Sequence, residues 1–115
     1  MELIFELIDR SGRILERHKV DKNRISIGRA YNNQLILSDP TVSPHHAVID
    51  ENESGKLVIR DLKSLNGIRI PHKDPEESIE IISGETYQIG QSRVRICLSD
   101  HEVAEAVKND EVDSI

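Results

Sequence analysis

The stretch DPTVSPHHAVID, residues 39–50, brings together side chains whose types could do chemistry. Ser43 could act as a nucleophile, with a nearby histidine taking its proton. His45 and His46 could instead supply two nitrogen ligands to a metal ion. A third reading is that the serine hydroxyl binds a ligand while a histidine supports the loop.

The arrangement of the histidines disfavours a metal site. Neighbouring side chains of a strand point to opposite faces, so His45 and His46 cannot readily face one ion. No cysteine cluster and no HExxH motif accompanies them, and His18, His72 and His101 are scattered along the chain. We therefore expect no metal and no cofactor.

The surroundings of Ser43 also disfavour a hydrolase. A catalytic serine usually sits on a sharp turn, with a remote histidine and an acid oriented toward it. The chain has no GxSxG motif. A small domain without a long loop also offers little enclosed space for a substrate, so we expect no enzyme activity.

Three polar loop segments together point to a binding function. GRAYNNQL carries Gly28 and Arg29, TVSPHHA carries Ser43, and KSLNG carries Ser64 and Asn66. The planar fork of arginine suits phosphate oxygens, and a serine hydroxyl adds a donor. An asparagine amide can pair with the main chain of an extended peptide. Taken singly, each residue is also ordinary turn or surface chemistry; together they could hold a phosphorylated residue and its flanks.

The elements that would position these loops are short strands. The apolar runs alternate with period two, are rich in Ile, Val and Leu, and are separated by turn residues at spacings of about ten residues. This pattern predicts an all-β antiparallel sandwich or barrel, in which strand ends on one side bring loops together. The runs span residues 3–8, 24–28, 34–37, 46–50, 56–62, 67–70, 78–82, 86–90 and 93–98.

Length and composition limit the possible functions. The 115 residues suit one domain. Residues 1–98 hold 14 bases and 15 acids, and aromatic residues make up 3% of the chain, which argues against a nucleic-acid partner. No apolar run approaches the roughly 18 residues that cross a membrane, and the start MELIFELIDR does not resemble a signal peptide. We expect no membrane insertion and a cytoplasmic location.

The C-terminal segment differs from the rest in charge. From Ser99 onward the chain has six acids and one base, Lys108. We expect a domain at 1–98 and an acidic tail or linker at 99–115, which could hold a short helix.

The three motifs in their order resemble the forkhead-associated (FHA) domain family. The matching segments are ISIGRAYNNQLILSDPTVSPHHAVI, then VIRDLKSLNGIRI, and the later SGETYQIGQSRVRI resembles the closing strands of the family. The resemblance runs from about residue 1 to residue 98. It implies an FHA-like β-sandwich of about eleven short strands, whose loops at one end bind phosphothreonine peptides without catalysis.

The resemblance also implies roles for individual residues. Arg29 and Ser43 would contact the phosphate, and Asn66 would hydrogen-bond the peptide main chain, with Ser64 beside it. The supporting residues would be Gly28, which permits the Arg29 loop, His46, which pins the binding loop, and Gly67, which permits the turn after Asn66.

Three positions beside the predicted site residues depart from the family pattern, and one of them is Ile68, which follows Gly67 where threonine is common. Pro44 follows Ser43 and lacks an N–H that another residue would offer. Leu65 precedes Asn66 where a threonine could add a phosphate contact. These departures predict a modest affinity and keep a second hypothesis open.

Two functions are therefore carried forward. The first is a phosphothreonine-dependent module that recruits a threonine-phosphorylated partner in Ser/Thr kinase signalling. The second is a phosphate-independent scaffold domain of the same fold, belonging to a larger protein. The sequence leaves open the peptide preference, the kinase, the partner and the oligomeric state.

Overall fold

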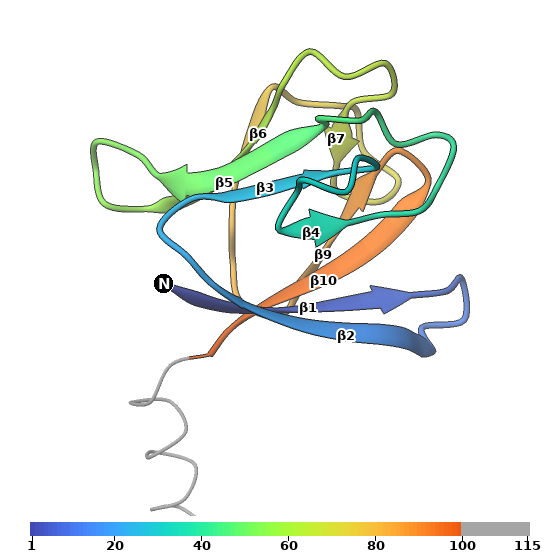
Figure 1. Cartoon of the computed structure of the whole chain (residues 1–115), viewed down its shortest axis with the longest axis horizontal. Coiled ribbons are helices and arrows are strands. Elements are labelled where there is room, and N and C mark those ends of the chain that lie inside the picture. The colour runs from blue at the N-terminus through green and yellow to red at the C-terminus, as the bar shows by residue number, and fades with distance from the viewer. Residues whose placement is uncertain (100–115) are drawn as a thin grey trace, which may run out of the picture.

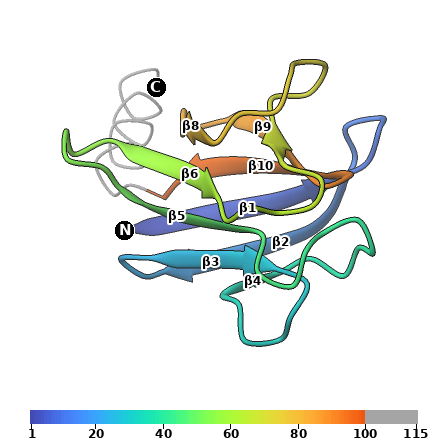
Figure 2. The same cartoon turned by 90° about the horizontal axis from the view of Figure 1, so that it is seen from above.

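The computed structural model describes residues 1–99 as two five-stranded sheets packed face to face. Figures 1 and 2 show the two layers from the side and from above. The first sheet has the strand order β2-β1-β10-β9-β7, with β1 at Glu2–Ile8, β2 at Ile14–Asp21, β7 at Ile68–Arg69, β9 at Glu85–Ile89 and β10 at Ser92–Leu98. The second has the order β4-β3-β5-β6-β8, with β3 at Ile25–Gly28, β4 at Leu35–Ile36, β5 at Ala47–Glu51, β6 at Leu57–Asp61 and β8 at Ser78–Glu80.

The all-β sandwich expected from the sequence is confirmed, with ten strands where the resemblance implied about eleven. Neighbouring strands pair antiparallel except β3 and β4, which pair parallel through Ile27 opposite Leu35. Residues 1–99 contain no helix. The expected C-terminal helix, and all of the acidic segment except Ser99, lie outside the described residues, so the division at 98 stays a prediction.

The core lies between the sheets and follows the period-two pattern of the sequence. In β10, Val94 and Ile96 are fully buried, whereas Arg93 and Arg95, which alternate with them, point to the outer face. The central strand β5 is buried more completely, since Ala47, Val48 and Ile49 are all inaccessible or nearly so. This continuous core fixes the register of the strands and hence the positions of the loops that leave them.

The candidate loops meet at one end of the sandwich. The connections from β3 to β5 and from β6 to β7 lie on the right of Figures 1 and 2. The β1–β2 and β9–β10 turns lie at the same end. Within residues 1–99 there is no helix long and apolar enough to cross a membrane.

Candidate functional site

The loop after β3 is fastened to the loop before β5 by the main chain. The N–H of Arg29 donates to the carbonyl of Ser43 at 3.1 Å, and the N–H of Ala30 donates to the carbonyl of Pro44 at 3.2 Å. Gly28 permits this approach, because a Cβ there would lie 2.1 Å from the carbonyl oxygen of Pro44. Any side chain at Gly28 would therefore force the two loops apart.

The Arg29 side chain is exposed and only partly engaged. Its Nε donates to the carbonyl of Val42 at 3.0 Å, which sets the direction of the guanidinium group. Within residues 1–99 its two terminal nitrogens have no hydrogen-bond partner and the side chain makes no ion pair. Arg29 therefore presents an oriented cation with a free face, which suits a phosphate.

Ser43 is held at both its main chain and its hydroxyl. Its N–H donates to Nδ1 of His46 at 3.0 Å, and its Oγ accepts from the N–H of Leu65 at 3.1 Å. A hydroxyl has one proton to donate, and these contacts leave that proton unused. Ser43 can therefore donate to an anion beside Arg29, whose loop it adjoins.

His46 braces the site from within the core. It is fully buried, and its Nε2 lies 2.8 Å from the carbonyl oxygen of Gly67. Since Nδ1 accepts from Ser43, the ring is the neutral tautomer that donates from Nε2 to Gly67. One side chain thus joins the Ser43 loop to the turn before β7.

The same geometry excludes a serine–histidine nucleophile. Nδ1 of His46 is occupied by the main-chain N–H of Ser43, and Nε2 faces Gly67, so neither nitrogen is available to the hydroxyl. The neighbouring His45 is exposed and makes no hydrogen bond within the described residues. No group of three His, Cys, Asp or Glu side chains suited to a metal occurs within residues 1–99.

The turn between β6 and β7 presents Asn66 toward the other loops. Nδ2 of Asn66 donates to the carbonyl of Thr41 at 2.6 Å, while its Oδ1 has no partner within the described residues. Gly67 has a φ of 73°, the left-handed region that glycine adopts without strain. The free Oδ1 can accept a main-chain N–H from a ligand.

Ser64 lies in this turn but is already engaged. Its hydroxyl donates to Oδ1 of Asp61 and accepts from the N–H of Gly67 at 2.8 Å. In this geometry Ser64 supports the turn from inside, so a direct contact with a peptide would require these bonds to open. Its predicted role in binding stays a prediction.

Sequence reasoning did not single out Asn33. Its side chain is 7% exposed, and Nδ2 donates at 2.8 Å to the carbonyls of both Ala30 and Pro44. It therefore locks the Arg29 loop against the residue after Ser43. Asn33 is one of two adjacent asparagines in a segment of turn residues, and such a segment gives no sign that one of its side chains is buried. The sequence therefore did not point to Asn33.

The Thr41 turn was missed as well. Oγ1 of Thr41 donates to Oδ1 of Asp39 at 2.8 Å and accepts from the N–H of Gln91 at 2.8 Å. Partial burial alone would raise the pKa of Asp39, but hydrogen bonds from Thr41 and Ser92 outweigh it and hold that pKa below its ordinary range. Asp39 therefore stays ionised and fixes the turn that receives Asn66.

An open hollow lies beside Arg29. Its other lining residues are Tyr31, Ser38 and Pro40, and Tyr31 is 91% exposed. None of these three was singled out from the sequence. The hollow offers an apolar and aromatic surface next to the free guanidinium group, which suits the flank of an extended ligand.

Comparison with known proteins identifies the family. The FHA domain model matches residues 25–90, which include Gly28, Arg29, Ser43, His46 and Asn66. The chain belongs to the FHA domain family.

Regulatory proteins are among its relatives. The chain is 36% identical over 76 residues to the transcriptional regulatory protein EmbR of Mycobacterium tuberculosis, an alignment that covers 66% of this chain and 17% of EmbR. It is 33% identical over 78 residues to the glycogen accumulation regulator GarA of Mycolicibacterium smegmatis, covering 68% of this chain and 48% of GarA. Both names describe regulatory proteins.

A solved structure gives the same fold. Mycobacterium tuberculosis EmbR in complex with a low-affinity phosphopeptide superposes with a TM-score of 0.66 at 28% identity, covering 84% of this chain and 24% of that one. The chain therefore spans about half of GarA and a smaller part of EmbR.

Proposed function

We propose that this FHA domain binds a threonine-phosphorylated segment of a partner protein and so recruits that partner in Ser/Thr kinase signalling. The observation that carries the proposal is the donor set at the loop end. Arg29 has two unpaired guanidinium nitrogens, and the hydroxyl proton of Ser43 is unused in the loop fastened to it. A phosphate carries close to two negative charges and three strong acceptor oxygens, so it binds these donors more strongly than a carboxylate does.

The neighbouring residues support an extended peptide as the carrier of the phosphate. Oδ1 of Asn66 is free to accept a main-chain N–H, and the exposed Tyr31 can pack against a flank. The relative EmbR was solved with a phosphopeptide. A preference for threonine over serine is taken from the family resemblance.

The departures at Pro44 and Leu65 bear on affinity rather than on the core site. Pro44 has no N–H, and its carbonyl accepts from Ala30 and Asn33. Leu65 still holds Ser43 through its main-chain N–H, while its side chain is 88% exposed and offers no donor. We therefore expect a modest affinity, with recruitment taking place in the cytoplasm.

The test compares a library of threonine-phosphorylated peptides with its unphosphorylated twin, using wild type, Arg29→Ala and Arg24→Ala. Arg24 is an exposed arginine that makes no ion pair within residues 1–99, so it controls for the lost charge. We expect wild type and Arg24→Ala to retain phosphorylated peptides. Arg29→Ala should bind them more weakly by a factor of roughly 100 or more, as expected for about two charge-assisted hydrogen bonds.

The outcome also decides between the two hypotheses. Equal binding of both libraries, or binding unaffected by Arg29→Ala, would refute phosphate recognition and favour the phosphate-independent scaffold. Phosphoserine peptides of the same sequences test the threonine preference separately.

A further inference from the structure

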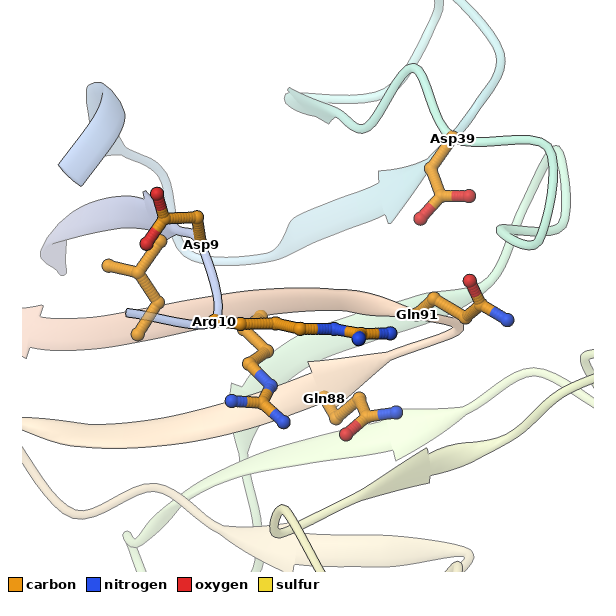
Figure 3. A pocket seen from close by; sticks show the side chains of 7 residues that line it. Asp9, Arg10, Asp39, Gln88 and Gln91 are labelled. Atoms are coloured by element: carbon orange, nitrogen blue, oxygen red, sulfur yellow. The ribbon is translucent and has the colours of Figure 1, made fainter. Parts of the chain in front are cut away.

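A second polar pocket lies at the same end of the sandwich, on the outer face of the first sheet. It is lined by Ile8, Asp9, Arg10, Asp39, Gln88, Gln91 and Arg93 and has a volume of about 450 Å³. Figure 3 shows Arg10 of the β1–β2 turn lying between Asp9 and the side chains of Gln88 and Gln91. The space is ample for a carboxylate or a phosphate, and of these residues the site described above uses only Asp39 and Gln91, both through the Thr41 turn.

The arginines of this pocket have no acidic partner. Neither Arg10 nor Arg93 makes an ion pair or a side-chain hydrogen bond within residues 1–99. At a distance of two residues along the same face of the sheet, Glu6 forms ion pairs with both Arg17 and Arg95. On β1 the residue opposite Arg95 is Glu6, whereas the residue opposite Arg93 is the apolar Ile8. This face therefore pairs its arginines in one row and leaves Arg93 unpaired in the next.

The two carboxylates of the pocket are committed to their own turns. Oδ1 of Asp9 accepts from the N–H and hydroxyl of Ser11 and from the N–H of Arg13. Asp39 accepts from Thr41 through Oδ1 and from Ser92 through Oδ2. In Figure 3 the Asp9 carboxylate points away from Gln88 and Gln91. Oδ2 of Asp9 has no partner within residues 1–99, and the remaining unpaired groups are mainly donors, on the two guanidinium groups and the Gln91 amide.

The Thr41 turn connects this pocket to the proposed phosphothreonine site. The carbonyl of Thr41 accepts from Asn66, and its hydroxyl accepts from the N–H of Gln91. On the sheet, Arg93 lies opposite Gln88, and Gln88 lies opposite Arg69, two residues after Gly67. A chain held at Asn66 would therefore meet an arginine-bearing surface directly beyond it.

We propose that the pocket of Arg10 and Arg93 binds a second anionic group, a carboxylate or a second phosphate, carried by the same partner segment. Donors with no internal partner, on the exposed Arg10 and the half-buried Arg93, favour an anion, and the shared turn favours one that arrives with the phosphothreonine peptide. The partner part of this inference rests on the proposed function, whereas the anion site itself can be tested without it.

The anion site is tested by NMR titration of ¹⁵N-labelled protein with inorganic phosphate. We expect chemical-shift changes at the amides of Gln88, Gln91 and Arg93 that persist in Arg29→Ala and disappear in the double variant Arg10→Gln/Arg93→Gln. Equal shifts in the double variant, or none at Gln88 and Gln91 in wild type, would overturn the site. This result is independent of whether any phosphopeptide binds.

The partner's second anion is tested with phosphothreonine peptides. One flanking position at a time carries Asp, its neutral match Asn, or a second phosphothreonine. At one or more positions we expect Asp or phosphothreonine to raise the affinity of wild type about five- to tenfold, and the stronger of the two identifies the anion. The gain should vanish in the double variant, which should still bind the neutral peptide normally.

Arg24→Gln, which removes one exposed arginine that does not line the pocket, is the control and should retain the gain. A gain that survives in Arg10→Gln/Arg93→Gln, or no gain at any position, would overturn the assignment to the partner segment. If wild type binds none of the phosphopeptides, that result refutes the proposed function instead. Thermal unfolding of the double variant should match wild type closely, since neither arginine has an internal partner to lose.

Discussion

Replacing His46 by alanine tests whether one buried ring holds the binding end together. The change removes the acceptor of the Ser43 N–H at 3.0 Å and the donor to the Gly67 carbonyl at 2.8 Å. Each main-chain group left without a good partner costs about 1 kcal/mol or more. Lost packing of a fully buried ring adds about 1 kcal/mol. We expect a loss of about 3 kcal/mol in the free energy of unfolding.

The assay is urea unfolding followed by circular dichroism. With an m-value of about 1.5 kcal/mol/M, a loss of about 3 kcal/mol lowers the midpoint by about 2 M. The neighbouring residue supplies a matched control, since His45 is exposed and makes no hydrogen bond in the described part of the chain. His45→Ala should change the free energy of unfolding by less than about 0.5 kcal/mol.

Peptide binding gives the second readout. At low temperature without denaturant, a domain of ordinary stability, about 5–15 kcal/mol, stays folded after this loss. The affinity of His46→Ala for a phosphothreonine peptide should nevertheless fall about tenfold or more, because the Ser43 loop and the Gly67 turn are no longer tied. A loss of stability below about 1 kcal/mol, or one equal to that of His45→Ala, would refute the role of the His46 ring in tying the two loops together.

Three further substitutions test other parts of the structure. Gly28→Ala should destabilise the domain by about 2–3 kcal/mol and weaken peptide binding, because the new Cβ would meet the Pro44 carbonyl; normal urea unfolding would contradict this. Thr41→Val removes the acceptor of the Gln91 N–H and should cost about 1–2 kcal/mol, measured in the same way. Glu6 has its pKa held below its ordinary 4.5 by hydrogen bonds from two arginines. Its contribution is therefore present above pH 4.5 and lost as the pH falls through the lowered value, so the stability gap between wild type and Glu6→Gln should shrink in acid; a gap that widens in acid would contradict this.

Most of the strands were predictable because burial imposes an alternating pattern. Each of the nine apolar runs overlaps one strand of the structure. The strand that was missed is β2, at Ile14–Asp21, where nearly every residue is exposed. It lies at the edge of the first sheet and pairs only with β1, and among its residues only Val20 packs against the core. An edge strand without a buried face leaves no period-two signal in the sequence.

Sequence motifs could name the candidate site residues, whose roles stay a prediction, but not the network of hydrogen bonds that connects them. Motif order pointed to Arg29, Ser43 and Asn66, and the structure brings their loops to one end. The sequence could not show that Asn33 is buried or that Thr41 links three loops, because these bonds join residues far apart in the chain. Polar turn residues look alike in sequence whether they face solvent or another loop.

This end of the sandwich suits an anion because its polar groups form two sets, one that faces inward and fixes the loops and one that faces outward. Buried groups face inward: His46 joins Ser43 to Gly67, and Asn33 bridges two carbonyls. These contacts consume acceptors and fix the loops, and they leave donors on Arg29 and Ser43 directed outward. Because the loops are fixed by the folded core, little ordering remains to oppose binding. The proposed phosphate recognition would therefore depend as much on these inward-facing residues, which would not touch the ligand, as on Arg29 and Ser43, which would.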